Sequence, residues 1–218
     1  MISVITIDRE YGSGAPAISQ RLADRLGWKL WDELLSSEIA RLTDSDLAAV
    51  KQREERKDPL YYRLFKSFLR GSFEATSQVP QLGLLDADRI VAITQRVVLD
   101  AAAGGRCVIV GRGSQYFLRE RRDAYHVFIY APYEEKIRRE VEAGRSPEQT
   151  RRLVETVDRD RAAFIQAYFA KDWPTRHLYH LMINSKIGDE AVVETVVHGI
   201  ATQERLRPRL AEERPPSS

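Results

Sequence analysis

Gly12, Ser13 and Gly14 form a short glycine-containing turn soon after the apolar run at residues 3–7. Glycine permits positive φ angles at such a turn and lets backbone N–H groups approach an anion closely. Pro16 suits the first turn of a following helix, whose N-terminus carries a partial positive charge. A strand, a glycine turn and a helix in this order predict a loop that binds or transfers phosphate.

The loop departs from the usual phosphate-loop pattern, G-x-x-x-x-G-K-[ST]. In this register the pattern begins at Arg9, and its second glycine is Gly14. Ala15 stands where a lysine would reach the β- and γ-phosphates, and Pro16 stands where a hydroxyl would bind Mg²⁺. Taken alone, the stretch fits an ordinary strand–turn–helix junction about as well as it fits a phosphate loop.

Other cationic side chains could supply the positive charge that phosphoryl transfer needs around the transferred group. Arg9 lies in the loop itself, where it could reach a phosphate or pair with Glu10 or Asp8. Gly111 and Arg112 follow a predicted strand, at the position where α/β proteins place ligand contacts. Each of the two arginines could instead be an ordinary surface or structural residue.

Residues 158–161 read DRDR and place Arg159 and Arg161 on opposing sides of a predicted helix. These arginines could clamp phosphates, or they could belong to a solvated charged face, as charge runs usually do. Asp32 ends another short strand, where it could orient an acceptor or cap a helix beginning at Glu33. The four histidines show no metal-ligand spacing, so we predict no metal site held by the protein.

Five short apolar runs predict the strands that position these residues, because their β-branched and aromatic content favours strand over helix. Helical patterns lie between the runs. Strands that alternate with helices predict an α/β fold with a mostly parallel sheet covered on both faces. The predicted strands are 3–7, 28–32, 106–111, 125–131 and 179–184, and the predicted helices are 16–26, 86–103, 133–143, 147–170 and 189–206.

Residues 33–104 interrupt this alternation and are too long for a simple crossover between strands. They look helical throughout, which predicts a helical insertion over one edge of the sheet. Within it, four aromatic residues are spaced for one helical face, which favours a core or a homodimer contact over a base-stacking site. These residues are Tyr61, Tyr62, Phe65 and Phe68.

The composition limits the classes of protein to which the chain can belong. The 218 residues suit one domain with an insertion, and a net charge of +2 argues against a dedicated nucleic-acid binder. Cys107 is the single cysteine, so no intrachain disulfide or cysteine-based zinc site forms, and its apolar neighbours predict a buried thiol. No apolar run is long enough to span a membrane, so we expect a cytoplasmic protein. Residues 207–218 are polar and contain proline, which predicts a flexible tail.

Five stretches in order resemble the cytidylate kinases. The likeness is closest to the cytidylate kinase-like family, whose members typically carry REYGSGG where true cytidylate kinases carry GPSGSGKG, so the missing lysine is a feature of that family. The stretches are VITID…YGSGAPAISQRLADRLGWKLWD (4–32), VIVGRGSQYFLR (108–119), VFIYAPYEEKIRRE (127–140), VDRDRAAF (157–164) and YHLMINSKIGDEAVVETV (179–196).

The resemblance implies a P-loop kinase fold with a five-stranded parallel core in a single domain of residues 1–206. Residues 33–104 would be the helical insertion that binds a nucleoside monophosphate, and residues 145–170 would be the lid. The implied activity is ATP-dependent phosphoryl transfer to a nucleoside monophosphate, with CMP or dCMP favoured and Mg²⁺ bound with the nucleotide. A catalytically degenerate binding protein for nucleotide or phosphate, or a kinase for another small acceptor, is the alternative.

The resemblance also implies roles for single residues. Arg112 would hold the phosphate of the acceptor, and the lid arginines would clamp the ATP phosphates. The family's further lid arginine is missing here, where the chain reads AAFIQ (162–166). The candidate catalytic residues are Arg9, Arg159 and Arg161, and the candidate binding residues are Gly12, Ser13, Gly14, Ala15, Asp32, Gly111 and Arg112.

Overall fold

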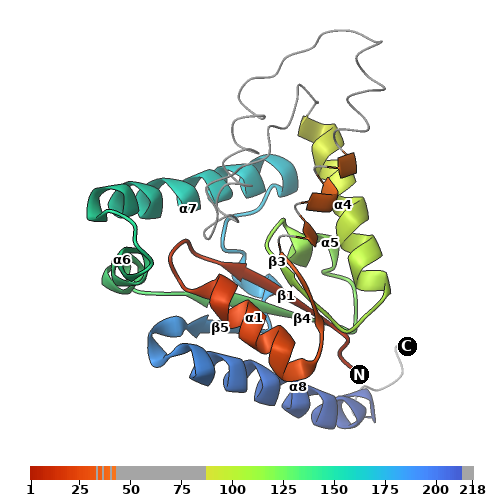
Figure 1. Ribbon diagram of the computed structural model, residues 1–218. Coiled ribbons are helices and arrows are strands. Elements are labelled where there is room, and N and C mark those ends of the chain that lie inside the picture. The colour runs from red at the N-terminus through yellow and green to blue at the C-terminus, as the bar shows by residue number, and fades with distance from the viewer. Residues whose placement is uncertain (33, 36, 40, 43–86, 213–218) are drawn as a thin grey trace, which may run out of the picture.

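Five parallel strands form one sheet at the centre of the protein (Figure 1). The computed structural model describes residues 1–32, 34, 35, 37–39, 41, 42 and 87–212. Each pair of neighbouring strands is parallel, which confirms the predicted α/β fold with a five-stranded parallel sheet. Across the sheet the order is β2 (Lys29–Trp31), β3 (Cys107–Val110), β1 (Val4–Arg9), β4 (Ala124–Tyr130) and β5 (Leu181–Asn184).

Helices cover both faces of the sheet (Figure 1). One face carries α1 (Ala15–Leu26) and α8 (Asp189–Glu212), and the other carries α4 (Ala87–Ala103) and the short α5 (Ser114–Phe117). Short connections lead from β1 into α1, from β3 into α5 and from β5 into α8, as expected of a parallel sheet built from strand–helix–strand units.

The period-two alternation of β1 divides the core between the two faces. Ile5 and Ile7 are fully buried and pack with Ile18 of α1. Val4 points the other way and packs with Val98 of α4. Because both faces are buried, the strand carries apolar residues on both faces in its first half, as is usual for parallel sheets.

Two further helices lie beside the loop that joins β1 to α1 (Figure 1). These are α6 (Tyr133–Glu142) and α7 (Pro147–Phe169), and α7 lies within the predicted lid. Ser146 caps α7, since its side chain accepts a hydrogen bond from the Gln149 N–H at 3.2 Å. Single turns of 3₁₀ helix, η1 (Arg176–Leu178) and η2 (Ser185–Ile187), flank β5.

The final helix is longer than the sequence pattern predicted. It was expected to end at residue 206 and to be followed by a flexible tail, but α8 continues to Glu212. Residues 213–218 of the predicted tail lie outside the described residues.

The predicted insertion is described only at its two ends. Residues 34, 35, 37–39, 41 and 42 are helical, and α4 forms its last part. Leu35 and Ile39 are buried in the core on the α4 face. The aromatic residues 61, 62, 65 and 68, on which the homodimer prediction rests, lie outside the described residues.

Cys107 packs in the core as the sequence predicted, and His126 is also buried. Cys107 is buried, and burial raises the pKa of its thiol to about 11, so the thiol stays protonated. His126 Nδ1 lies 2.7 Å from the Thr6 hydroxyl, and the His126 N–H donates to His180 Nδ1 at 2.9 Å. Within the described residues, no helix is both long and apolar enough to cross a lipid bilayer.

Candidate functional site

The carboxyl ends of the parallel strands bring the predicted site residues to one edge of the sheet. The loop at 10–14 follows β1, and the turn at 111–113 follows the neighbouring β3. The Gly111 N–H donates to the Ile7 carbonyl at 2.8 Å, which ties the start of this turn to β1. Ligands bind at this edge in parallel α/β sheets.

The glycine loop has the backbone conformation that its sequence predicted. Gly12 and Gly14 have φ angles of 73° and 77°, in the left-handed region that favours glycine. Helix α1 begins at Ala15, and Pro16 lies in its first turn. Gly14 caps this helix without a side-chain hydrogen bond, so the helix terminus is built from backbone alone.

Ser13 serves the loop through internal hydrogen bonds. Its side chain is fully buried, and its hydroxyl donates to the Glu10 carbonyl at 2.8 Å. The Ser13 carbonyl in turn accepts a hydrogen bond from the Ser185 hydroxyl at 2.7 Å. The Ser13 side chain therefore holds the loop in shape, and a direct phosphate contact by this hydroxyl stays a prediction.

Helix α6 packs directly on the loop, and its atoms fill the space beside both glycines. A Cβ atom on Gly12 would lie 3.0 Å from Lys136 Cβ and 3.2 Å from the Lys136 carbonyl oxygen. A Cβ atom on Gly14 would lie 2.3 Å from Arg139 Nη1. Two cationic residues of α6, one turn apart, thus stand against the two glycines.

Lys136 and Asp158 connect the loop to α6 and α7. Lys136 Nζ lies 2.7 Å from Glu10 Oε2 and 3.5 Å from Asp158 Oδ2. The Tyr11 N–H and Arg161 Nη1 both donate to Asp158 Oδ1, at 2.9 Å and 3.0 Å. Burial raises the pKa of Asp158, while the charges of Arg161 and Lys136 act to lower it. The carboxylate is thus held among cationic groups and a loop N–H.

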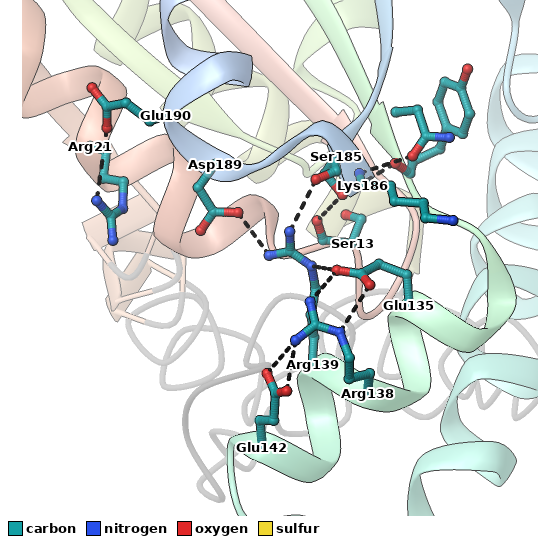
Figure 2. Close-up of polar contacts among 12 residues, drawn as sticks. Ser13, Arg21, Glu135, Arg138, Arg139, Glu142, Ser185, Lys186, Asp189 and Glu190 are labelled. Atoms are coloured by element: carbon teal, nitrogen blue, oxygen red, sulfur yellow. Dashed lines mark hydrogen bonds and ion pairs between the residues drawn. The ribbon is translucent and has the colours of Figure 1, made fainter.

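Arg139 joins three elements behind the loop, and Figure 2 shows its contacts. Its Nε donates to Glu135 at 2.8 Å, Nη1 donates to Asp189 at 2.8 Å, and Nη2 donates to the Ser185 carbonyl at 3.1 Å. Because Ser185 also binds the Ser13 carbonyl, the network couples α6, η2 and the start of α8 to the glycine loop. Arg139 therefore braces the loop.

Three arginines are buried side by side at the same edge of the sheet. Arg9, Arg112 and Arg161 have exposed fractions of 1%, 1% and 2%. Arg161 Nη1 donates to the Arg9 carbonyl at 2.8 Å. A Cβ atom on Gly111 would lie 2.0 Å from Arg9 Nη1, so the Arg9 guanidinium lies against the turn that carries Arg112. Buried arginines are rare unless they bind anions or carboxylates, so the cluster suits an anion.

The pKa of Arg112 reflects the charges of the same cluster. Burial lowers the pKa of Arg112 to about 9, the Asp32 carboxylate opposes this effect, and the charges of Arg9 and Arg161 lower the pKa further. Arg112 has a φ of 59°, in the left-handed region, between two glycines at 67°. Strained backbone of this kind is concentrated at functional sites. A bound phosphate would offset the mutual repulsion of the guanidinium groups.

Asp8 lies behind the cluster, where its carboxylate is fully engaged. Its Oδ2 accepts hydrogen bonds from Gln115 at 2.9 Å, Trp173 at 2.8 Å and Tyr179 at 2.7 Å, and its Oδ1 accepts the Arg9 N–H at 2.9 Å. Burial and then the Asp8 charge raise the pKa of Tyr179, so its hydroxyl stays a donor. This carboxylate fixes the end of β1, which in turn positions Arg9.

Of the site residues predicted from the sequence, Arg159 is exposed and the others lie together at the sheet edge. Arg159 is exposed on α7, whereas Arg161 is buried against the loop, as expected of residues on opposing sides of a helix. Asp32 is close enough to influence the pKa of Arg112, but a cap on Glu33 lies outside the described residues. The residues brought together at the sheet edge are Arg9, Gly12, Ser13, Gly14, Ala15, Asp32, Gly111, Arg112 and Arg161.

Sequence reasoning missed Lys136 and the role of Asp158. Lys136 belongs to a charged helix, which is usually exposed to solvent, and Asp158 lies in the DRDR stretch beside the candidate arginines. One signal was available, since Lys136 lies in the first turn after a strand, on the edge of the sheet where ligands bind.

Comparisons with known proteins give the family and the fold. A family model described as the cytidylate kinase-like family matches residues 4–187. An uncharacterized protein from Eubacterium ventriosum has a similar solved structure, with a TM-score of 0.64, 19% identity and coverage of 93% of this chain and 99% of that chain. A shikimate kinase from Acinetobacter baumannii in complex with shikimate gives a TM-score of 0.49, 17% identity and coverage of 93% and 95%. No curated protein sequence matches the chain.

Proposed function

We propose that this chain, which belongs to the cytidylate kinase-like family, transfers the γ-phosphoryl group of ATP to a nucleoside monophosphate, CMP or dCMP by preference. The family and the five-stranded parallel sheet together support a nucleotide kinase in general. The observation that carries the proposal is the burial of Arg9, Arg112 and Arg161 together beside a glycine loop.

The residues at the sheet edge divide between the two substrates in this proposal. The backbone of the loop at 12–15 and the terminus of α1 would hold the ATP phosphates. Arg112 would hold the phosphate of the monophosphate, and Arg9, which lies against the same turn, would stabilise the charge between the two. Arg161 would link the acceptor side of the site to the ATP side, because its Nη1 donates both to the Arg9 carbonyl and to Asp158.

The reaction itself needs little covalent work from the protein. An oxygen of the acceptor phosphate forms a new bond to the γ-phosphorus, while the bond from that phosphorus to the bridging oxygen of ADP breaks. The products are ADP and a nucleoside diphosphate. Buried guanidinium groups that are already in place stabilise the charge on the transferred group without reorganising, which is the main way such sites accelerate transfer.

Among the described residues, we find no group of protein side chains that would bind Mg²⁺ without the nucleotide. Within that part of the chain, no three acidic, histidine or cysteine side chains are grouped to bind a metal ion. Asp8 is the acidic residue before the loop, and its oxygens already accept four hydrogen bonds. Mg²⁺ would therefore enter with ATP and be held by the phosphates, which commonly supply most of its ligands in kinases.

A panel of acceptors tests the proposed activity. The protein is supplied with ATP and Mg²⁺ together with CMP, dCMP, UMP, AMP or GMP, and ADP formation is followed in a coupled assay. We expect the highest kcat/KM with CMP or dCMP. ADP formation that does not depend on any of the five acceptors would contradict a nucleoside monophosphate kinase, and a preference for another acceptor would contradict the CMP assignment.

One observation favours a second function, a nucleotide- or phosphate-binding protein that has lost catalysis. Ala15 and Pro16 replace both the lysine and the hydroxyl of the usual loop. A fold of this kind does not itself guarantee activity. Calorimetric binding of ATP or CMP without product formation would favour this alternative, and a kinase for another small acceptor would show ATP turnover only with that acceptor.

A further inference from the structure

Lys136 brings a buried positive charge against the glycine loop from a different helix. It lies in the first turn of α6, and 11% of its side chain is exposed. Its Cβ, carbonyl oxygen and Cα lie 3.0, 3.2 and 3.3 Å from the position that a Cβ on Gly12 would occupy. The loop therefore has a lysine beside it, although the residue at position 15 is alanine.

The partners of Lys136 hold its ammonium group at the loop. Glu10 lies in the loop, and its Oε2 is 2.7 Å from Lys136 Nζ and 3.3 Å from the Ala131 N–H, which donates to it. Asp158 Oδ2 is 3.5 Å from the same Nζ, which is longer than a strong charge-assisted hydrogen bond. Lys136 thus has one close partner that fixes it and one distant partner that it can exchange.

The Asp158 carboxylate occupies a position built for an anion. Its Oδ1 accepts hydrogen bonds from the Tyr11 N–H of the loop and from Arg161 Nη1, and its Oδ2 faces Lys136. A loop N–H, a guanidinium and an ammonium are the donors with which proteins bind phosphate oxygens. The side chain of Asp158 is 18% exposed, so this position is close to the surface of the site.

We propose that Lys136 supplies to a bound phosphate the positive charge that the loop lacks at Ala15, and that Asp158 fills this place when no phosphate is bound. The inference rests on the proposed function, because it takes the loop as the site of the ATP phosphates. A phosphate oxygen takes over the Tyr11 N–H and Lys136 Nζ from Asp158, while Glu10 keeps Lys136 in position.

Neighbouring cations suit this role less well. Arg139 stands against Gly14, but its three guanidinium nitrogens donate to two carboxylates and to the Ser185 carbonyl. Arg9 lies against Gly111, in the turn after β3, which is the side proposed for the acceptor. Arg161 shares the Asp158 partner with Lys136, but its Nη1 also donates to the Arg9 carbonyl, whereas Lys136 is paired with Glu10 of the loop itself.

The first test measures binding of ATP and of inorganic tripolyphosphate by calorimetry. Loss of one charge-assisted contact in Lys136→Met is expected to weaken both affinities by roughly 10- to 100-fold. Lys136→Arg keeps the charge and is expected to recover most of the affinity. Lys29→Met is the matched control, because Lys29 is an exposed lysine at the start of β2, at the opposite edge of the sheet, and its loss should leave both affinities unchanged.

The second test removes the competing carboxylate. Asp158→Asn keeps the size of the side chain but removes its charge, so tripolyphosphate is expected to bind more tightly, by roughly threefold to tenfold. A role of Asp158 in folding alone predicts lower stability with unchanged or weaker binding. Thermal unfolding midpoints measured for every variant identify any loss of affinity that comes from loss of structure.

The outcomes separate this inference from the proposed function. Unchanged affinity of folded Lys136→Met for ATP and tripolyphosphate overturns the inference, even if the wild-type protein is an active kinase. Lys136-dependent binding of tripolyphosphate by a protein that forms no nucleoside diphosphate supports the inference and removes the kinase. A wild-type protein that binds neither ATP nor tripolyphosphate overturns both.

Discussion

Arg161 of α7 donates from Nη1 to the backbone carbonyl of Arg9 at the end of β1, over 2.8 Å. The two residues are far apart in the chain, and both side chains are buried. This bond places a residue of α7, within the predicted lid, directly on the strand that leads into the glycine loop. It explains how the loop and α7 form one site, although the loop itself has no lysine.

If the proposed function holds, Arg161→Met should lower kcat/KM with ATP and CMP by roughly 10²- to 10³-fold, because in that proposal it removes a buried cation beside the transferred phosphate. Arg159→Met should cost clearly less, since Arg159 is exposed on the same helix. Steady-state kinetics of the two purified variants, with thermal unfolding as a check of folding, make the comparison. Equal losses of kcat/KM in the two variants would contradict the expectation that Arg161 matters because it is buried.

Gly111→Ala should displace the Arg9 guanidinium, because the new methyl group would lie 2.0 Å from Arg9 Nη1. Alanine at a positive φ should cost about 1–2 kcal/mol of stability through backbone strain. The kcat of Gly111→Ala should fall further than that of a variant that carries this strain alone. Gly27→Ala is the matched control, since its φ is 63° and no atom lies within 4 Å of its added Cβ. Equal activity of these two variants would show that the Arg9 position does not matter.

Asp8→Asn should lower the free energy of unfolding by about 2–4 kcal/mol, because one amide oxygen cannot replace a carboxylate that accepts four hydrogen bonds. Urea denaturation measures this loss. Asp24→Asn makes the same change on an exposed residue of α1 and should stay within about 0.5 kcal/mol of the wild type. A cost below about 1 kcal/mol for Asp8→Asn would mean that the Asp8 network adds little.

His126 should make the protein less stable in mild acid. Burial, and then the neighbouring His180, lower the pKa of His126 from 6.5 to about 4. The unfolded chain therefore binds a proton more readily than the folded one, so stability is fully present above pH 6.5 and is lost as the pH falls toward about 4. The contribution should be about 1–3 kcal/mol.

Urea titrations at a series of pH values test this, with His126→Gln as the variant and exposed His198→Gln as the control. The loss of stability between pH 6.5 and 4 should be smaller in His126→Gln than in the wild type, and unchanged in His198→Gln. Parallel pH profiles for all three proteins would contradict the assignment to His126.

The fold could be predicted from the sequence because its signals are local. Apolar runs such as 3–7 and 125–131 identify buried strands, and the glycines at 12 and 14 identify a turn with positive φ. The spacing of Arg159 and Arg161 correctly placed them on opposite sides of a helix, but it could not tell which side faces the loop. That choice depends on how α7 crosses the end of the sheet.

Lys136 and Asp158 could not be found as a pair from the sequence for the same reason. Their contact with Glu10 and Tyr11 depends on β4 lying next to β1, which is a property of the strand order. A charged helix is usually solvent-exposed, and nothing in the pattern of 133–143 marks position 136 as buried. The engagement of Asp8 by Trp173 and Tyr179 is likewise a long-range contact.

The most direct test of the central claim is ³¹P NMR of the wild-type protein with ATP, Mg²⁺ and CMP. This measurement follows both products of the transfer and distinguishes transfer from hydrolysis. We predict that the signals of CDP and ADP grow together in equal amounts while those of ATP and CMP fall. Release of inorganic phosphate without CDP, or an unchanged spectrum, would contradict phosphoryl transfer to CMP at this site.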